Sequence, residues 1–463
     1  MASGKKPKMR KRRSRVRWEL ITVLLILCIG GGLFVKLGLP ALRNKQNNDN
    51  NASEGSTSLS AEETVLEDDS SVHADVIKKD GEHDENPETD ASTAEGAGTV
   101  EKAAKKIEND RDLWVKDKLQ QMETGEKVAQ LFFVSADTLT EVENTTIVGD
   151  TFTSRLNEFP VGGIILSDGN IEDPEQLKSL TQMAEDVSRK RTGIDLFIGV
   201  EEEGGSVLQI ADNPEFELKD VGNMTEIGAK DNAQAAYDVG NYIGQYLDEY
   251  GINVNFAPVA DLIYNTPNSV VKNRAFGQDS VLVSDMVSKE VEALQKWNVS
   301  AVLKHFPGYG TIEGDPLEGD AVSLRTPTEL ETFDYAPFRK GIESGADFVM
   351  VGHIIMKTVD PESIPASVAS YFMTDVLKDK WGYEGIVITE DMSMAAIRNR
   401  YSPEEAVIMA INNGADMIVL TSGFEEVYEK VKDAANEGQI SEERLDDAVK
   451  RVLQVKYDKQ QKQ

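Results

Sequence analysis

Short apolar runs alternate with amphipathic stretches along the chain from about residue 110 onward. The amphipathic stretches, such as 174–190 and 232–250, have the periodicity of helices that bury one face. Eight apolar runs have the length of buried strands, and they lie at residues 128–134, 162–167, 195–200, 252–259, 300–306, 347–354, 385–390 and 416–421. Near-continuous apolar strands that alternate with helices predict a parallel sheet covered on both faces.

The number of strand–helix units narrows the fold class within the α/β proteins. Eight such units over residues 107–463 fit a TIM-like (β/α)8 barrel that forms a single catalytic-type domain. A doubly wound sheet is the alternative. The segment 444–457 has the pattern of the domain's final helix.

The N-terminal part of the chain has a different pattern. Residues 1–18 are rich in Lys and Arg, and the mostly apolar segment 19–39 is long enough to cross a bilayer. A basic flank stays on the cytoplasmic side, which predicts a single-pass signal anchor in the cell membrane and an extracellular barrel. A cleaved export signal is the alternative, although no A-x-A-like site follows the apolar segment.

Residues 40–106 are rich in Asn, Ser, Glu, Asp and Thr and have almost no aromatic side chains. Such a segment buries too little apolar surface to offset the entropy of ordering it, so we expect a disordered acidic linker. Two histidines, His73 and His83, fall in this linker, where they are expected to be solvated.

Composition limits the partners and cofactors. The formal net charge of −32 disfavours a nucleic-acid partner, because phosphate contacts need a basic surface. A single cysteine and four histidines leave little material for a metal centre. We therefore expect no nucleic-acid partner, no metal and no other cofactor.

Charged and polar side chains follow the ends of most predicted strands. The carboxyl ends of the strands of a barrel meet at one rim, where active sites are built. A rim rich in carboxylates, with Lys, Arg and His among them, suits a polyhydroxylated ligand that needs many orienting hydrogen bonds. The residues concerned are Asp168, Asn170, Glu201, Glu202, Glu203, Asp261, Lys304, His305, His353, Glu390 and Asp391.

Five segments in order carry a family resemblance, and all lie at predicted strand ends: GVEEEGGSV (199–207), FAPVADL (256–262), NRAFG (273–277), KHFPGYG (304–310) and ITEDMSM (388–394). They resemble glycoside hydrolase family 3, in its β-N-acetylglucosaminidase (β-N-acetylhexosaminidase) branch, over residues 120–457. The resemblance implies a barrel-only glycosidase acting on N-acetylglucosamine-containing glycan, with retention through a glycosyl-enzyme intermediate.

The sequence departs from the family pattern at its catalytic positions. Glu390 stands where the family has its nucleophilic aspartate. Tyr309 and Leu317 replace two histidines of the segment that follows the lysine–histidine pair, and the histidine at position 317 would be the acid/base. Asp315 of the same segment is retained, and Glu201 stands where an aspartate is usual.

Glu390 and Asp315 are the catalytic candidates. The extra methylene of Glu390 moves its carboxylate by about 1 Å, and a displacement of that size can cost ~100-fold in rate. Asp391, the next residue on the strand, should point to the opposite side. Asp315 shares its loop with Glu313, Glu318 and Asp320, and a solvated acidic loop without a catalytic role is the alternative.

The resemblance assigns Arg274, Lys304 and His305 to sugar binding, and Glu201, His353 and Asp391 complete the candidate substrate-binding set. Structural roles remain open for Arg274 as an ion pair and for His353 as a core hydrogen-bonding group. Two functions follow from these residues. One is a membrane-anchored extracellular glycoside hydrolase that removes terminal N-acetylhexosamine from cell-wall or related glycans. The alternative is a catalytically silent barrel that binds glycan or protein.

Overall fold

The computed structural model describes residues 92–264 and 270–462, with side chains from residue 105 onward. The basic segment, the expected anchor at 19–39 and the linker up to residue 91 lie outside these ranges. Within the described ranges, no helix has both the length and the apolar character that a membrane crossing requires.

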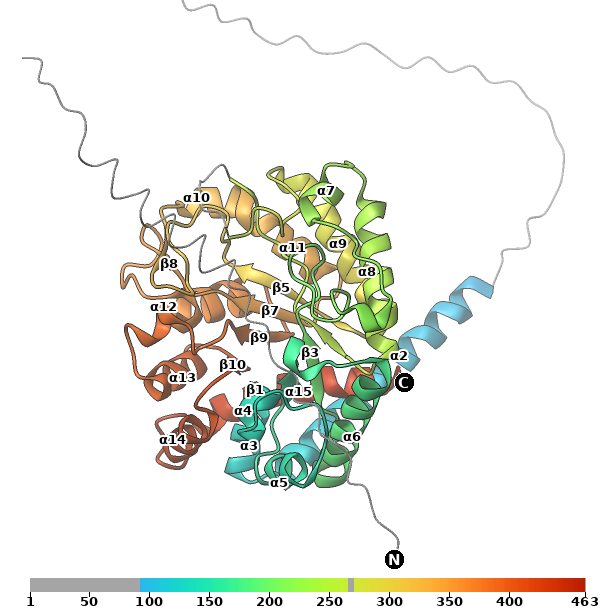
Figure 1. Ribbon diagram of the computed structural model, residues 1–463, viewed down its shortest axis with the longest axis vertical. Helices are drawn as coiled ribbons and strands as arrows, with labels where there is room; N and C mark the ends of the chain where they lie inside the picture. The colour runs from blue at the N-terminus through green and yellow to red at the C-terminus, as the bar shows by residue number, and fades with distance from the viewer. Residues whose placement is uncertain (1–91, 265–269, 463) are drawn as a thin grey trace, which may run out of the picture. The chain divides into compact units, whose positions relative to one another are not determined.

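Eight parallel strands form a nearly closed barrel surrounded by helices (Figure 1). The strand order is β10-β1-β2-β3-β4-β5-β7-β9, and a parallel bridge between Ile388 and Met417 links the two ends of the sheet. The strands are β1 (Phe132–Ser135), β2 (Gly163–Ile165), β3 (Phe197–Val200), β4 (Val254–Asn255), β5 (Ser300–Phe306), β7 (Phe348–Val351), β9 (Ile386–Thr389) and β10 (Ile418–Leu420). The eight barrel strands follow one another around the sheet in the order of the chain, so the barrel prediction is confirmed and a doubly wound order is excluded.

The strands are buried on both faces, which explains their near-continuous apolar sequences. Inward-facing aromatic rings fill the barrel, with Phe133 packed edge-on against Phe256 and Phe197 against Phe348, each pair 5.2 Å apart between ring centroids. The alternate strand positions pack outward against the helices. The barrel interior below the rim is therefore a packed core and not a channel.

The surrounding helices follow their strands along the chain. The longer ones are α3 (Thr124–Gln130), α5 (Asp150–Glu158), α6 (Pro174–Thr192), α8 (Ala233–Glu249), α9 (Ser280–Lys296), α11 (Tyr335–Glu343), α13 (Pro403–Asn412), α14 (Phe424–Asn436) and α15 (Glu442–Gln460). Shorter helices are α4 (Ala136–Thr140), α7 (Met224–Gly228), α10 (Pro327–Glu329) and α12 (Ala395–Arg398), with single turns or irregular helices at η1 (Asp168–Asn170), η2 (Pro214–Phe216), η3 (Leu330–Asp334), η4 (Ala366–Val368) and η5 (Tyr371–Lys380). The predicted helices at 174–190, 232–250 and 444–457 are α6, α8 and part of α15.

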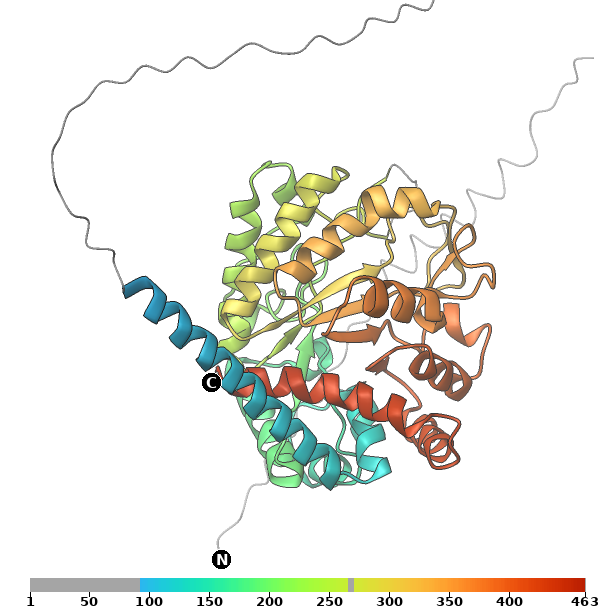
Figure 2. The same ribbon diagram turned by 180° about the vertical axis from the view of Figure 1, so that it is seen from behind.

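Helix α15 closes the barrel at the amino ends of the strands. Lys456 on this helix donates from Nζ to the carbonyl oxygen of Gly162, directly before β2, at 2.8 Å. Arg451 donates to the carbonyl oxygen of Tyr383, shortly before β9, also at 2.8 Å. Figure 2, seen from behind, shows α15 crossing in front of the barrel, so the opposite, carboxyl end is the open one.

Helix α2 (Ser92–Gln121) corrects the predicted boundary between linker and barrel. The linker was expected to be disordered to residue 106, but the helix begins at Ser92. Ala, Glu and Lys favour helix strongly, whereas the disorder prediction considered only the lack of core-forming residues. Farther along, α2 packs on α15 (Figure 2), with Val115 buried and an ion pair of 3.2 Å between Arg111 and Asp458.

Two strand boundaries also differ from the prediction. The first part of the run 128–134 belongs to helix α3, which a reciprocal capping box of Glu123 and Glu126 starts. A short apolar run does not by itself distinguish a buried helix from a strand. The run 347–354 contains β7 and the first residue of β8 (Ile354–Met356), which pairs with β6 (Ala321–Ser323) in a separate two-stranded sheet.

Candidate active site

Glu390 lies directly after β9, at the open end of the barrel, and is 9% exposed. Its Oε2 accepts the Tyr309 hydroxyl and, at 3.0 Å, the backbone N–H of His353. The same N–H lies 3.1 Å from the Tyr309 oxygen. One carboxylate oxygen is thus held by two donors, and no hydrogen bond to Oε1 is found among the described residues.

Lys304 is completely buried near the end of β5 and faces two carboxylates from the segment after β3. Its Nζ lies 2.8 Å from Oε1 of Glu201 and 2.6 Å from Oε1 of Glu203. Arg274 binds the two oxygens of Glu203 at 2.7 and 2.8 Å, which completes the cluster. Glu201 is the exposed member, with 42% of its side chain accessible.

The charges in this cluster hold one another in the ionised state. Burial alone would raise the pKa of Glu203, but Lys304 and Arg274 outweigh it and lower the pKa to about 2. Burial likewise opposes the charge of Lys304, yet Glu201 and Glu203 raise its pKa overall. The arrangement presents fixed charges that can bind sugar hydroxyl groups.

The role of Glu203 follows from its position on the chain. Glu201 and Glu203 both reach Lys304, whereas Glu202 points the other way and accepts the backbone N–H groups of Gln209, Ile210 and Ala211 at 2.7–3.0 Å. Of these three glutamates, only Glu201 was expected from the sequence to bind the ligand. The period-two alternation of extended backbone would have pointed to Glu203 as its companion.

His305 and Asp261 form a second buried group beside the first. The Nδ1 of His305 lies 2.8 Å from Oδ2 of Asp261, and its Nε2 lies 3.5 Å from a guanidinium nitrogen of Arg274. Asp261 also accepts the backbone N–H of Tyr309 at 2.6 Å. Asp261 therefore orients His305 and the loop that carries Tyr309, a function not assigned to it from sequence.

His353 and Asp391 are engaged by the protein itself. The two ring nitrogens of His353 lie 2.7 Å from the Ser367 hydroxyl and 2.9 Å from the backbone oxygen of Asp391. The Asp391 carboxylate binds the hydroxyl groups of Ser393 and Thr421, at 2.7 and 2.5 Å, and does not join Glu390. These contacts brace the segments after β7, β9 and β10.

The loop after β5 carries Asp315 and Leu317. Asp315 is half-buried, and its Oδ1 accepts the backbone N–H of Leu317 at 2.9 Å. Leu317 is 68% exposed. The loop is fixed to the segment around α12, because the Ala396 N–H donates to the Pro316 oxygen at 3.1 Å and Arg400 pairs with Asp320 at 2.6 Å. Within the described residues, no hydrogen bond joins Asp315 to Glu390.

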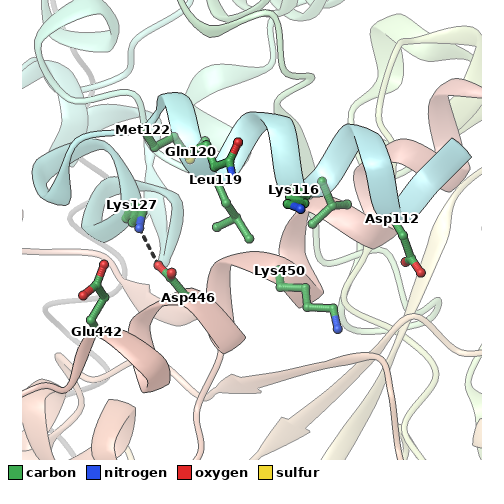
Figure 3. A pocket seen from close by; sticks show the side chains of 10 residues that line it. Asp112, Lys116, Leu119, Gln120, Met122, Lys127, Glu442, Asp446 and Lys450 are labelled. Carbon is green, nitrogen blue, oxygen red and sulfur yellow. Dashed lines mark hydrogen bonds and ion pairs between the residues drawn. The ribbon is translucent and has the colours of Figure 1, made fainter. Parts of the chain in front are cut away.

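A cavity of about 660 Å³ lies elsewhere, between α2 and α15 (Figure 3). Charged side chains of both signs line it, and one ion pair, Lys127 with Asp446 at 2.5 Å, bridges it. Because α15 covers the amino ends of the strands, this cavity is separate from the Glu390 site. It contains none of the predicted site residues.

Comparison with known proteins matches this geometry to a family. The Glycosyl hydrolase family 3 N terminal domain matches residues 123–455. A β-N-acetylglucosaminidase of this family from Paenibacillus sp. str. FPU-7 superposes with a TM-score of 0.68 at 31% identity, over 74% of this chain and 64% of that protein.

Two sequence relatives are named β-hexosaminidases. Beta-hexosaminidase A of Pseudoalteromonas piscicida is 29% identical over 65% of this chain, and the match spans 54% of that relative. Beta-hexosaminidase of Nitrosomonas eutropha is 30% identical over 60% of this chain and 79% of its own length. The chain thus spans only about half of the Pseudoalteromonas protein. With a family match that covers most of the chain and the expected barrel, this protein belongs to glycoside hydrolase family 3.

Proposed function

We propose that the protein is a β-N-acetylhexosaminidase that removes terminal N-acetylhexosamine from cell-wall or related glycans with retention of configuration. The observation that carries this proposal is the position of Glu390 at the open end of the barrel, linked through Tyr309 and His305 to the Lys304–Glu203–Arg274 cluster. The names of the relatives support the substrate class. The nearby fixed charges supply the orienting contacts that a sugar ring needs.

The reaction has two steps in this proposal. Glu390 Oε1 attacks the anomeric carbon and forms an ester, while the bond to the leaving oxygen breaks and that oxygen takes a proton. Water then attacks the same carbon, releases Glu390 and restores the original configuration. Glu201, Lys304, His305 and Arg274 hold the sugar through its hydroxyl and amide groups.

Asp315 is the proton donor in this proposal, because the other acidic residues of its loop are less suitable. Pairing with Arg400 lowers the pKa of Asp320, which makes it a poor acid. Glu313 and Glu318 are exposed to solvent. Asp315 is half-buried and sits beside Leu317, the position of the family's acid/base histidine.

The cellular location is part of the proposal. A basic N-terminal segment followed by the apolar segment 19–39 supports a signal anchor with the barrel outside the cell. Protease added to intact cells should then release the barrel. A barrel that stays protected until lysis would contradict the proposed location.

Turnover by the full chain in detergent tests the activity. We expect release of the aryl group from an aryl β-N-acetylglucosaminide, and NMR of the first sugar product should show the β-anomer. Binding of N-acetylglucosamine without any turnover would support the silent barrel instead. Absence of both binding and turnover would refute a glycan-directed function.

A further inference from the structure

The two departures from the family pattern at positions 309 and 390 contact each other. Tyr309 and Glu390 are 81 residues apart in sequence, yet the Tyr309 hydroxyl donates directly to Oε2 of Glu390. The first stands in place of a histidine and the second in place of an aspartate. Because both side chains meet at one hydrogen bond, neither substitution can be understood alone.

The surrounding structure fixes the ring of Tyr309. It stacks on His305 with 4.5 Å between ring centroids and an interplanar angle of 10°. Gly352 lies against the same ring, and a Cβ at that position would come within 2.8 Å of it. Asp261 holds the backbone of Tyr309 at 2.6 Å. These contacts therefore fix the orientation of the Tyr309 ring and the position of its hydroxyl.

We propose that Tyr309 is a positioning residue that holds one oxygen of Glu390 and leaves the other free to attack the sugar. This inference rests on the proposed glycosidase activity for its kinetic meaning. The His353 N–H, 3.0 Å from the same Oε2, supplies the second donor. Two donors on one oxygen orient the carboxylate.

Other roles for Tyr309 fit the geometry less well. In retaining glycosidases the acid/base lies about 5–5.5 Å from the nucleophile, whereas Tyr309 is in hydrogen-bond contact with Glu390. Tyr309 is also a poor nucleophile, because burial and the Glu390 charge raise its pKa well above the usual value. A hydroxyl that keeps its proton is suited to donating a hydrogen bond.

This contact also explains why position 390 has a glutamate and not the shorter aspartate. An aspartate at position 390 would withdraw its carboxylate from the Tyr309 hydroxyl by about one methylene. Glu390→Asp alone should therefore reduce turnover, even though it restores the family's residue. The glutamate and the tyrosine form a matched pair.

The first test measures the attack step alone. A 2,4-dinitrophenyl β-N-acetylglucosaminide has a leaving group that needs no proton, so its turnover reports the nucleophile. We expect Tyr309→Phe in the full chain to lower kcat at least tenfold and to leave KM within about twofold. The matched control is Tyr335→Phe, because the Tyr335 hydroxyl is buried and has no hydrogen-bond partner in the described part of the chain. An unchanged kcat in Tyr309→Phe, or a loss seen only in KM, would overturn the proposal.

A second test does not depend on turnover. The thermal midpoints of Tyr309→Phe, Glu390→Met and the double variant form a cycle. If the two side chains act as a pair, the double variant loses less than the sum of the single losses. The same cycle with Tyr335→Phe should be additive. Additive losses of thermal midpoint for Tyr309→Phe and Glu390→Met would overturn the proposal that the two side chains act as a pair. If the wild type turns over no substrate, the proposed glycosidase activity is refuted. The thermal cycle then decides by itself whether Tyr309 and Glu390 act as a pair.

Discussion

Lys304 and Glu203 form a completely buried ion pair, with 2.6 Å between Nζ and Oε1 and side-chain exposures of 0% and 2%. Arg274 satisfies the second oxygen of Glu203, so two cations share one carboxylate at the bottom of the site. A carboxylate held in this way contributes to stability.

Glu203→Gln should destabilise the fold, because it leaves Lys304 and Arg274 in a buried site with one counter-charge fewer. Loss of one partner of a buried pair costs about 3–5 kcal/mol. Urea unfolding at pH 7 measures this, with Glu202→Gln as a control that removes a buried charge outside the cluster.

The same residue predicts a pH dependence. The pKa of Glu203 is lowered to about 2 in the folded state, from an ordinary value of 4.5. The unfolded chain therefore binds the proton more readily, and stability on the order of 3 kcal/mol is lost as pH falls from about 4.5 to 2. Unfolding curves of the wild type and Glu203→Gln should converge over that range. A constant difference between them would contradict this assignment.

The fold could be predicted from sequence because its signal is local. Eight apolar runs and the helices between them required no knowledge of contacts. The position of Glu390 at the rim followed in the same way, since a strand end specifies its place. The strand predicted at 128–134 was wrong in its first part, because Val128 and Ala129 would be buried equally well in a helix or a strand.

The pairing within the site could not be predicted, because it depends on side-chain reach across the barrel. From the sequence, Tyr309 was noted only as the replacement of a family histidine. Its contact with Glu390 depends on how the loop after β5 folds back. Asp391 was expected to face away from Glu390, and its contacts with Ser393 and Thr421 agree with that. Alternation along one strand is local, whereas contact between two loops is not.

Because of Lys456, the free energy of unfolding of the barrel should change with pH in the alkaline range. Burial lowers its pKa to about 7 from 10.5, while Nζ donates to Gln130 and Gly162. The unfolded chain then binds the proton more tightly between pH 7 and 10.5, so this residue's contribution to stability rises over that interval. Lys456→Met should lack the rise, although it leaves two acceptors unpaired. Chemical denaturation at pH 7 and pH 9.5 compares the two proteins, and identical pH slopes would refute the assignment.

Glu390→Gln should abolish turnover and leave binding of N-acetylglucosamine nearly unchanged. The amide keeps the shape of the side chain and can still accept from Tyr309, but it is not a nucleophile. Calorimetric titration and the aryl-glycoside assay measure the two properties separately. Glu384→Gln is the control, because this exposed glutamate precedes β9 at the opposite end of the barrel. Turnover that survives in Glu390→Gln would place the nucleophile elsewhere.

Leu317→His tests whether proton donation limits the reaction. The backbone N–H of Leu317 already lies 2.9 Å from Oδ1 of Asp315, so an imidazole at this position would have a carboxylate beside it. A nearby carboxylate favours the protonated imidazole, which is the form that donates a proton. We expect faster cleavage of a glycoside with a poor leaving group, such as a disaccharide substrate, by about 10- to 100-fold. Cleavage of the dinitrophenyl substrate should not change, because its leaving group needs no proton. Equal acceleration of both substrates would mean that the substitution acts on the loop and not on proton transfer. No acceleration of either would indicate that Asp315 already supplies the proton efficiently.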